Sequence, residues 1–189
     1  MTKRRDKKEA LLDATLTLVN NHGFHAAPMS KIAKLAGVSP ATIYIYFENK
    51  QDMMNAIYLK SKRAMADAAF DGYSSDMSVK RGFELMWRNV LEFKMTHKRE
   101  ATLLEQCETS PIVGDEILKE GISYLSPMSQ LLRRGIDENI IKNAADYELY
   151  AYAFYPLTFI SQNIGRSQVS NNDLNIDMLF SMAWDSIRC

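Results

Sequence analysis

The sequence contains few residues that interrupt helices or build covalent frameworks. It has 8 glycines, 5 prolines and 2 cysteines among 189 residues. So few breakers, with no alternation of short strands and turns, favour a helical protein. The two cysteines, Cys107 and Cys189, cannot form the disulfide framework of a small secreted domain. We therefore expect an all-α protein that folds in a reducing compartment.

Long apolar runs are also missing. The longest nearly apolar run, residues 149–160, has 12 residues and contains Pro156, so it is too short to span a bilayer. Residues 1–9 are charged and no uninterrupted apolar segment follows them, unlike a signal peptide. These features predict a cytoplasmic protein that does not act at a membrane.

The sequence lacks the common catalytic and metal-binding patterns. It has no nucleophile–base pair, glycine-rich phosphate loop or paired-carboxylate motif. Its three histidines, His22, His25 and His97, have no cysteine or carboxylate at ligand spacing. We therefore expect no enzyme activity, no metal and no cofactor.

The formal net charge of zero conceals an asymmetry along the chain. Residues 1–63 hold 11 Lys or Arg against 5 Asp or Glu, whereas residues 64–189 hold 12 against 18. The basic run at residues 3–8, Lys-Arg-Arg-Asp-Lys-Lys, is typical of a solvated tail when it stands alone. The surplus of positive charge in the first part of the chain suits a polyanionic partner, and such a run can then serve as an arm that contacts phosphates.

Residues 29–47 have the pattern of two short helices joined by a tight turn. Ile32, Ala33 and Ala36 give the first helix one inward face, and the small Ala33 allows a second helix to cross closely. Gly37 can take the left-handed conformation that ends a helix, and Val38 can fill the corner. This pattern predicts a helix-turn-helix.

The second helix of this motif begins at Ser39-Pro40. We expect the Ser39 hydroxyl to cap the helix and Pro40 to occupy its first position, where no amide hydrogen is needed. Ile43 and Phe47, four residues apart, face the core. The remaining side chains are left for a partner: Pro40, Ala41, Thr42, Tyr44, Ile45 and Tyr46.

Four segments together resemble a known family. They are Leu11-Leu12-Asp13-Ala14, Gly23-Phe24, Ile32-Ala33-Lys34-Leu35-Ala36-Gly37-Val38-Ser39 and Thr42-Ile43-Tyr44-Ile45-Tyr46-Phe47-Glu48-Asn49-Lys50. They resemble the N-terminal DNA-binding domain of TetR-family transcriptional regulators of the AcrR-like kind, over about the first 58 residues. The chain departs from the family where Ala27-Pro28 replaces the usual Thr or Ser, and where Ala41 replaces a frequent Gly. The missing hydroxyl removes one usual phosphate contact.

The resemblance implies a helix-turn-helix DNA-binding domain of three helices at residues 1–50, and a helical ligand-binding and dimerisation domain at residues 51–189. Apolar periodicity predicts about nine helices along the chain. They are 5–21, two within 29–47, 50–71, 79–97, 99–108, 114–137 with a kink at Pro127, 146–166 and 174–187.

We expect the DNA contacts to come from the helix-turn-helix and its flanks. The predicted DNA-binding residues are Ser30, Lys31, Ser39, Pro40, Ala41, Thr42, Tyr44, Tyr46 and Lys50. The resemblance implies that Tyr44, Tyr46 and Lys50 contact the DNA backbone, although either tyrosine could simply pack with a wet hydroxyl. Thr42 can meet a base edge, while Pro40 and Ala41 can make only apolar contacts, for example with a thymine methyl.

The acidic part of the chain holds the residues of a candidate effector pocket. Aromatic side chains with carboxylates nearby suit an aromatic or cationic ligand, although most such residues could equally belong to the core. The predicted pocket residues are Tyr58, Trp87, Phe93, Glu105, Tyr124, Met128, Tyr152, Tyr155 and Phe159.

These observations predict a ligand-responsive regulator that binds double-stranded operator DNA as a homodimer, with repression as the usual outcome in the family. The segment 146–166 is apolar almost all round, so we expect it to pack with the last helix against a second copy. One alternative is a nucleoid-associated or other DNA-binding protein of the same fold without an inducer. Another is a thiol or redox sensor acting through Cys107, which could instead be a small buried apolar residue.

Overall fold

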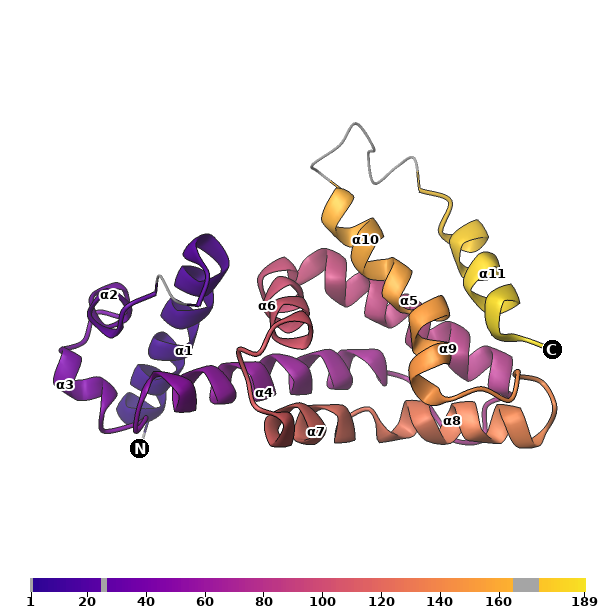
Figure 1. Ribbon diagram of the computed structural model, residues 1–189, viewed down its shortest axis with the longest axis horizontal. Helices are drawn as coiled ribbons and strands as arrows, with labels where there is room; N and C mark the ends of the chain where they lie inside the picture. The colour runs from indigo at the N-terminus through magenta and orange to yellow at the C-terminus, as the bar shows by residue number, and fades with distance from the viewer. Residues whose placement is uncertain (1, 25–26, 165–173) are drawn as a thin grey trace. The chain divides into compact units, whose positions relative to one another are not determined.

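A computed structural model describes residues 2–24, 27–164 and 174–189, with side chains from residue 6 onward. Besides turns and one isolated antiparallel bridge between Ile141 and Arg188, this part of the chain is helical, which confirms the all-α fold class. Its eleven helices are α1 (Thr2–His22), α2 (Met29–Leu35), α3 (Pro40–Ile43), α4 (Lys50–Ala69), α5 (Val79–Thr96), α6 (Lys98–Thr109), α7 (Asp115–Ser123), α8 (Ser126–Asp137), α9 (Asp146–Ala153), α10 (Tyr155–Asn163) and α11 (Ile176–Ile187) (Figure 1).

The number of helices exceeds the predicted nine because two expected helices are each divided. The segment 114–137 forms α7 and α8, with Pro127 in the first turn of α8, so the predicted interruption is present. The segment 146–166 forms α9 and α10, and its expected last two residues lie outside the described residues. This second division corrects the prediction of one continuous helix.

The break between α9 and α10 depends on Pro156, in the first turn of α10, and on a distant tryptophan. Proline lacks an amide hydrogen and crowds the carbonyl four residues earlier, which interrupts a helix. Leu157 N donates to Phe154 O at 3.0 Å, so the Ala153 carbonyl has no helical donor four residues later. It instead accepts a hydrogen bond of 2.8 Å from Trp87 Nε1 on α5. The indole thus satisfies a carbonyl that the break would leave orphaned.

The chain forms two compact units, each with its own core. The first comprises Met1–Ala64 and Lys98–Ser123, and the second comprises Met65–His97 and Tyr124–Cys189. Helix α4 contributes its first fifteen residues to one unit and its last five to the other. The predicted boundary at residue 50 separates a DNA-binding domain from a ligand-binding and dimerisation domain. It divides the chain by function, not by compactness, and stays a prediction.

In the first unit, α1 packs against both α2 and α6. Buried side chains from α1, α2, α3, the α3–α4 connection and the first half of α4 contribute to the interior: Leu11, Ala14, Val19, Ile32, Ala33, Ile43, Phe47, Met53, Met54 and Ile57. The buried Thr15 hydroxyl donates to Leu11 O at 2.7 Å and lies 2.7 Å from Met53 Sδ, linking α1 to α4. Local helix formation and burial therefore hold the helix-turn-helix on a framework of longer helices.

Polar contacts join α6 to α1 in the same unit. The Arg99 guanidinium donates to Asp13 Oδ1 at 2.5 Å and to Thr17 Oγ1 at 2.9 Å. In the other direction, Asn20 Nδ2 donates to Arg99 O at 2.8 Å. A second ion pair joins α4 to α6, with the buried Lys62 Nζ 2.6 Å from Glu108 Oε1. Helix α6 is therefore tied to the helices that carry the helix-turn-helix.

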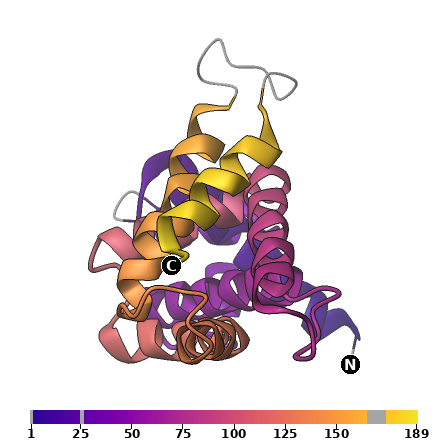
Figure 2. The ribbon, with the colours of Figure 1, turned by 90° about the vertical axis from the view of Figure 1, so that its right-hand side faces the viewer.

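The second unit is built around α5, against which α8, α10 and α11 pack, while α9 lies beside α11 (Figure 2). Phe83 on α5 is in the middle of an aromatic cluster, with its ring centroid 5.4 Å from those of Phe154 and Trp184 and 6.2 Å from that of Phe180. Phe83, Phe154 and the Trp87 indole are almost fully buried. Aromatic packing thus supplies much of this core.

Candidate DNA-binding site

The corner between α2 and α3 is formed at Gly37. Its φ of +66° lies in the left-handed region, which a residue with a Cβ adopts only with strain. Gly37 N donates to Lys34 O at 3.2 Å, and Val38 N donates to Ala33 O at 3.0 Å. These bonds use carbonyls at the end of α2 that would otherwise lack donors. The predicted helix-ending role of Gly37 is confirmed.

Ser39 precedes α3 but does not cap it through its side chain. Its backbone is extended, with φ −73° and ψ 150°, and no backbone amide donates to its hydroxyl. The Ser39 Oγ instead lies 2.9 Å from Thr42 Oγ1, so the two hydroxyls hydrogen-bond to one another. Pro40 stands at the start of α3 as predicted. The prediction that the Ser39 hydroxyl caps α3 was therefore wrong, because this hydroxyl pairs with the Thr42 hydroxyl instead of accepting from a backbone amide of the helix.

The segment after the corner has an inner and an outer face. Ile43 and Phe47 are 0% and 3% exposed, as the sequence predicted. Tyr44 and Ile45, in contrast, are 63% and 62% exposed. Pro40, Ala41 and Ser39 are exposed as well, and Thr42 and Tyr46 are partly exposed. We call these exposed and partly exposed side chains of residues 39–46 the outer face. The outer face is largely apolar and is open to a partner.

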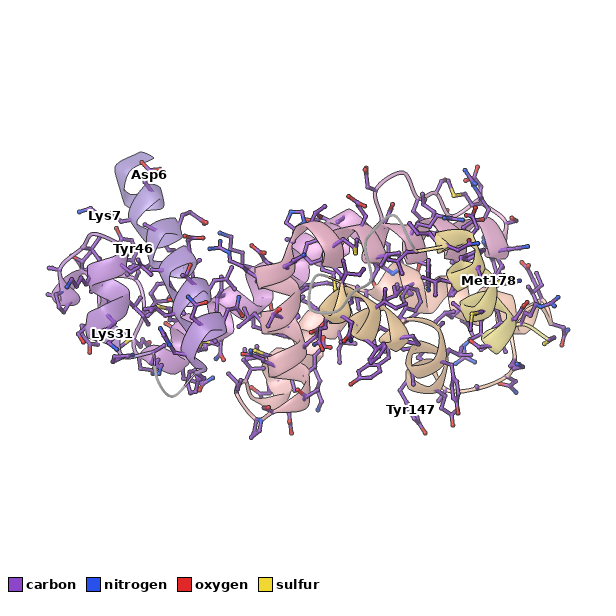
Figure 3. The ribbon with its side chains drawn as sticks, turned by 90° about the horizontal axis from the view of Figure 1, so that it is seen from above. Asp6, Lys7, Lys31, Tyr46, Tyr147 and Met178 are labelled. Atoms are coloured by element: carbon purple, nitrogen blue, oxygen red, sulfur yellow. The ribbon has the colours of Figure 1, made fainter. Side chains whose placement is uncertain are left out.

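Positive charge and hydroxyl groups flank this outer face. Ser30, Lys31 and Lys34 on α2 are exposed, and Figure 3 shows Lys31 and Tyr46 on the helix-turn-helix with Lys7 on α1. Lys8 on α1 is exposed, and its Nζ lies 5.5 Å from the centre of the Phe47 ring. The basic run at residues 3–8 belongs to α1, although the side chains of residues 3–5 lie outside the described residues. Such flanking charge suits phosphate contacts.

Lys50, at the start of α4, is partly buried and already has partners within the unit. Its Nζ donates to Phe24 O and lies 4.4 Å from the centre of the Phe24 ring. Burial lowers the pKa of the Lys50 ammonium from its ordinary value. Lys50 therefore holds the turn that follows α1 near the start of α4, a structural role that the sequence analysis missed.

The start of α4 is fixed by two side chains that accept backbone hydrogen bonds, which the sequence analysis also missed. Asp52 N donates to Asn49 Oδ1 at 2.9 Å, and Glu48 N donates to Asp52 Oδ2 at 3.0 Å. The spacing Asn-x-x-Asp before a helix is close to a capping box and could have revealed this pair. The cap sets where the exposed turn ends and α4 begins.

The predicted pocket residues fall in both units and differ in burial. Tyr58 and Glu105 belong to the first unit and the other seven to the second. In the second unit, Trp87, Phe93 and Met128 are buried, and the Phe93 ring stacks on that of His97 with centroids 4.7 Å apart. Three others are exposed at 70%, 54% and 70%: Tyr152, Tyr155 and Phe159. Exposure of more than half of a side chain does not agree with a place inside a pocket of this chain.

Of the three remaining predicted pocket residues, Tyr58 on α4 is 0% exposed, and the other two are partly buried. Glu105 lies on α6, and Tyr124 lies between α7 and α8.

Among the described residues, no group of three or more His, Cys, Asp or Glu could hold a metal ion. Across those same residues, no helix combines the length and apolar character needed to cross a membrane.

Cys107 on α6 is buried, with 1% exposure. Burial, followed by the negative charge of Glu108, raises the pKa of the Cys107 thiol to about 12. Because the thiolate is the reactive form, this thiol is poorly suited to sensing oxidants near neutral pH. The structure therefore favours the small buried apolar residue over the redox sensor.

Comparison with known families decides what this helix-turn-helix belongs to. Residues 11–57 match the family described as "Bacterial regulatory proteins, tetR family", and residues 78–188 match "Tetracyclin repressor-like, C-terminal domain". This chain belongs to the TetR family. The chain is thus a helix-turn-helix transcriptional regulator, and the prediction that it is not an enzyme is confirmed because TetR-family regulators are not enzymes. The AcrR-like subtype stays a prediction.

Individual relatives agree with this assignment. The crystal structure of a TetR family transcription regulator from Marinobacter aquaeolei VT8 is 28% identical, with a TM-score of 0.92, and covers 100% of this chain and 99% of its own. The "Uncharacterized HTH-type transcriptional regulator YhgD" of Bacillus subtilis is 27% identical over 154 residues, 80% of either chain. The "Fatty acid metabolism regulator protein" of Bacillus subtilis is 26% identical over 151 residues, 79% of this chain and 78% of its own.

Proposed function

We propose that this TetR-family chain binds operator DNA as a homodimer in the cytoplasm and is released from it by a small molecule, so that it acts as a repressor. The observation that carries this proposal is the exposed outer face at residues 39–46, placed on a buried framework beside exposed lysines of α2. An apolar face of this kind is costly in water and suits a major groove, while the flanking lysines suit phosphates. Ser30, Lys31, Tyr44 and Tyr46 are the proposed backbone contacts.

The homodimer is supported by large apolar side chains exposed on the last three helices. They are Tyr147, Tyr152, Tyr155 and Phe159 on α9 and α10, and Ile176, Met178 and Met182 on α11; Figure 3 shows Tyr147 and Met178 on the outside of the second unit. Exposed aromatic and methionine side chains in such number are typical of an interface rather than of a free surface. We propose that a second copy of this chain covers them.

Phe154 does not belong to that surface. It lies within the segment 146–166, which the sequence analysis expected to pack against a second copy, but it is 1% exposed and its ring lies 5.4 Å from that of Phe83. The break at Pro156 explains the difference, because residues on the two sides of the break do not share one helical face. Interface tests should therefore use Phe159 rather than Phe154.

We propose that the effector binds within residues 51–189 and acts on the DNA through α4, which contributes residues to both compact units. Two recognition helices must lie roughly 34–36 Å apart, or a multiple of that distance, to enter major grooves on one face of the duplex. An effector that favours another spacing lowers operator affinity tenfold to a hundredfold for about 1.4–3 kcal/mol of differential binding. The effector classes to screen are aromatic molecules, cationic molecules and, because one relative is named for fatty acid metabolism, fatty acids.

The test begins with selection of bound duplexes from a random-sequence library, followed by affinity measurements on the selected duplex. Lys31→Ala should weaken binding, whereas Lys119→Ala, which removes an exposed lysine of α7, should not. An effector found by thermal-shift screening is then titrated with and without the duplex. By reciprocity the duplex must weaken effector binding by the same factor. Equal affinities in both titrations would overturn the inducer mechanism and leave the nucleoid-associated alternative, which needs no effector.

A further inference from the structure

The outer face lacks the side chains that read purines through paired hydrogen bonds. Between Gly37 and Phe47 the sequence contains no Arg, Lys, Asn, Gln, Asp or Glu. Arg or Lys reads guanine, and Asn or Gln reads adenine, by two hydrogen bonds to the base edge in the major groove. The nearest amide side chain after this segment, Asn49, accepts from Asp52 N at 2.9 Å in the cap of α4. Paired hydrogen bonding to purines is therefore not available to this segment.

The hydroxyl groups of the segment are also partly committed. Ser39 and Thr42 hydrogen-bond to one another at 2.9 Å, and Thr42 is partly buried. One of these two hydroxyls spends its only hydrogen on the other. The hydrogen-bonding capacity that this pair can offer to a base edge is correspondingly reduced.

What the segment does present is apolar surface. Ile45 is 62% exposed, next to Tyr44 at 63%, and Pro40 and Ala41 are exposed at the start of α3. Ile45 is β-branched, so few side-chain rotamers are available to it and little entropy is lost when a partner covers it. The only apolar group on the major-groove edge of DNA bases is the C5-methyl group of thymine.

We propose that this chain reads its operator chiefly through thymine methyl groups, with Ile45 as the main specificity-determining side chain and Pro40 and Ala41 as further apolar contacts. The inference rests on the proposed DNA binding and names the chemistry of its target. Duplex DNA is the occupant because residues 1–63 carry 11 Lys or Arg against 5 Asp or Glu, and because exposed Lys31 and Lys34 flank the apolar face. The lysines hold the backbone, and the apolar side chains select the sequence.

The experiment replaces thymine by uracil in the selected duplex. Deoxyuridine keeps the Watson–Crick pairing and the hydrogen-bonding groups of thymine but lacks the C5-methyl group. Substitution should weaken binding by roughly three- to fivefold for each contacted thymine, which is the value of one buried methyl group. The dependence of affinity on salt should stay the same, because no phosphate contact is lost. Deoxyuridine placed in the flanks of the duplex serves as the control for general effects on DNA.

A variant of the protein locates the contact. Ile45→Ala should weaken binding to the thymine duplex. At the one or two positions whose methyl group Ile45 contacts, replacing thymine by uracil should then weaken binding of this variant no further, because the side chain that contacts the methyl group is already missing. Ile122→Ala is the matched control, since Ile122 on α7 is an isoleucine with nearly the same exposure, 60%, outside the helix-turn-helix. It should bind both duplexes as the unchanged protein does.

The outcomes separate this inference from the function on which it rests. Equal binding of thymine and uracil duplexes, or a selected sequence without thymine in its core, would overturn the methyl reading while operator binding stands. A uracil penalty that Ile45→Ala leaves intact at every position would remove Ile45 as its source and so overturn the assignment. Failure to select or bind any duplex would overturn the proposed function and this inference together.

Discussion

The ring of Tyr58 on α4 lies directly against the backbone of Gly121 on α7. A Cβ added at Gly121 would stand 2.7 Å from Tyr58 Cε1 and 2.8 Å from its Oη. Tyr58 is 0% exposed, so its ring cannot move aside into solvent. The glycine therefore sets how closely these two helices of the first unit approach one another.

Gly121→Ala should destabilise the protein by about 1–3 kcal/mol because the added methyl group overpacks a filled site. Gly114→Ala is the control, since a Cβ at Gly114 meets nothing within 4 Å. Urea denaturation followed by circular dichroism measures both variants. A free energy of unfolding for Gly121→Ala equal to that of the control would show that Tyr58 does not confine this position.

Lys50→Ala should change both stability and DNA binding, and the two effects can be separated. Loss of the hydrogen bond to Phe24 O and of the contact with its ring should destabilise the first unit by about 1 kcal/mol. If Lys50 also contacts a phosphate, the slope of log affinity against log salt falls by about 0.9. The salt slope of Lys50→Ala is compared with that of Lys34→Ala, which removes an exposed lysine of α2. An unchanged slope with reduced stability would make Lys50 a structural residue only.

Tyr44→Phe should weaken DNA binding across different sequences to a similar degree and leave the salt slope unchanged, because it removes an uncharged hydroxyl. Tyr44 is 63% exposed, so the variant should fold with unchanged stability. Thr42→Ala is the contrasting variant and should mainly relax base preference. Competition between selected and random duplexes measures both, and a change of preference in Tyr44→Phe would argue against a backbone contact.

The buried thiol of Cys107 should make stability depend on pH in the alkaline range. The folded protein keeps the thiol proton up to a pKa of about 12, whereas an unfolded cysteine loses it near 8.5. The stabilisation is therefore complete below about pH 8.5 and is lost as the pH rises toward 12, at up to about 1.4 kcal/mol per pH unit. Cys107→Ala should flatten the decline, while Cys189→Ala should not. The same pair gives a second measurement, because a thiol reagent at pH 7 should label exposed Cys189 quickly and Cys107 only after unfolding.

Charges placed on α10 and α11 should abolish dimer formation. Phe159→Glu and Met182→Glu each replace an apolar side chain by a carboxylate. Phe159 is 70% and Met182 63% exposed in the single chain, so the subunit should still fold. Ile122→Glu makes the same kind of change outside these helices and serves as control. Sedimentation at micromolar concentration should give dimers for the unchanged protein and the control and monomers for the two variants. A monomeric unchanged protein would exclude the proposed interface.

The sequence was informative where structure depends on neighbouring residues. Gly37 at the corner, Pro40 at the start of α3 and the inward Ile43 and Phe47 follow from local geometry, and each lies where it was predicted. Pro156 is a local signal for the break between α9 and α10, but the Ala153 carbonyl at the break accepts from Trp87, more than sixty residues earlier in the chain. No local pattern reveals that hydrogen bond. The partner of a side chain is equally hard to foresee, as the Lys50 ammonium on the Phe24 carbonyl shows.

The exposed aromatic residues of α9 and α10 show a different limit. Apolar periodicity says that a side chain avoids water but does not say whether its own chain or a second copy covers it. Phe154 and Phe159 are both apolar residues of one predicted helix, yet one is 1% and the other 70% exposed. The pocket predicted from such residues therefore mixed core positions with surface positions.

The aromatic core of the second unit also determines what fluorescence can report. Both tryptophans of the sequence, Trp87 and Trp184, are buried in that unit, and the first unit contains none. Tryptophan emission therefore follows the environment of α5 and α11, while far-ultraviolet circular dichroism follows helices throughout the chain. Denaturation curves from the two signals will coincide if the two units unfold as one cooperative body. They will separate if the first unit unfolds independently.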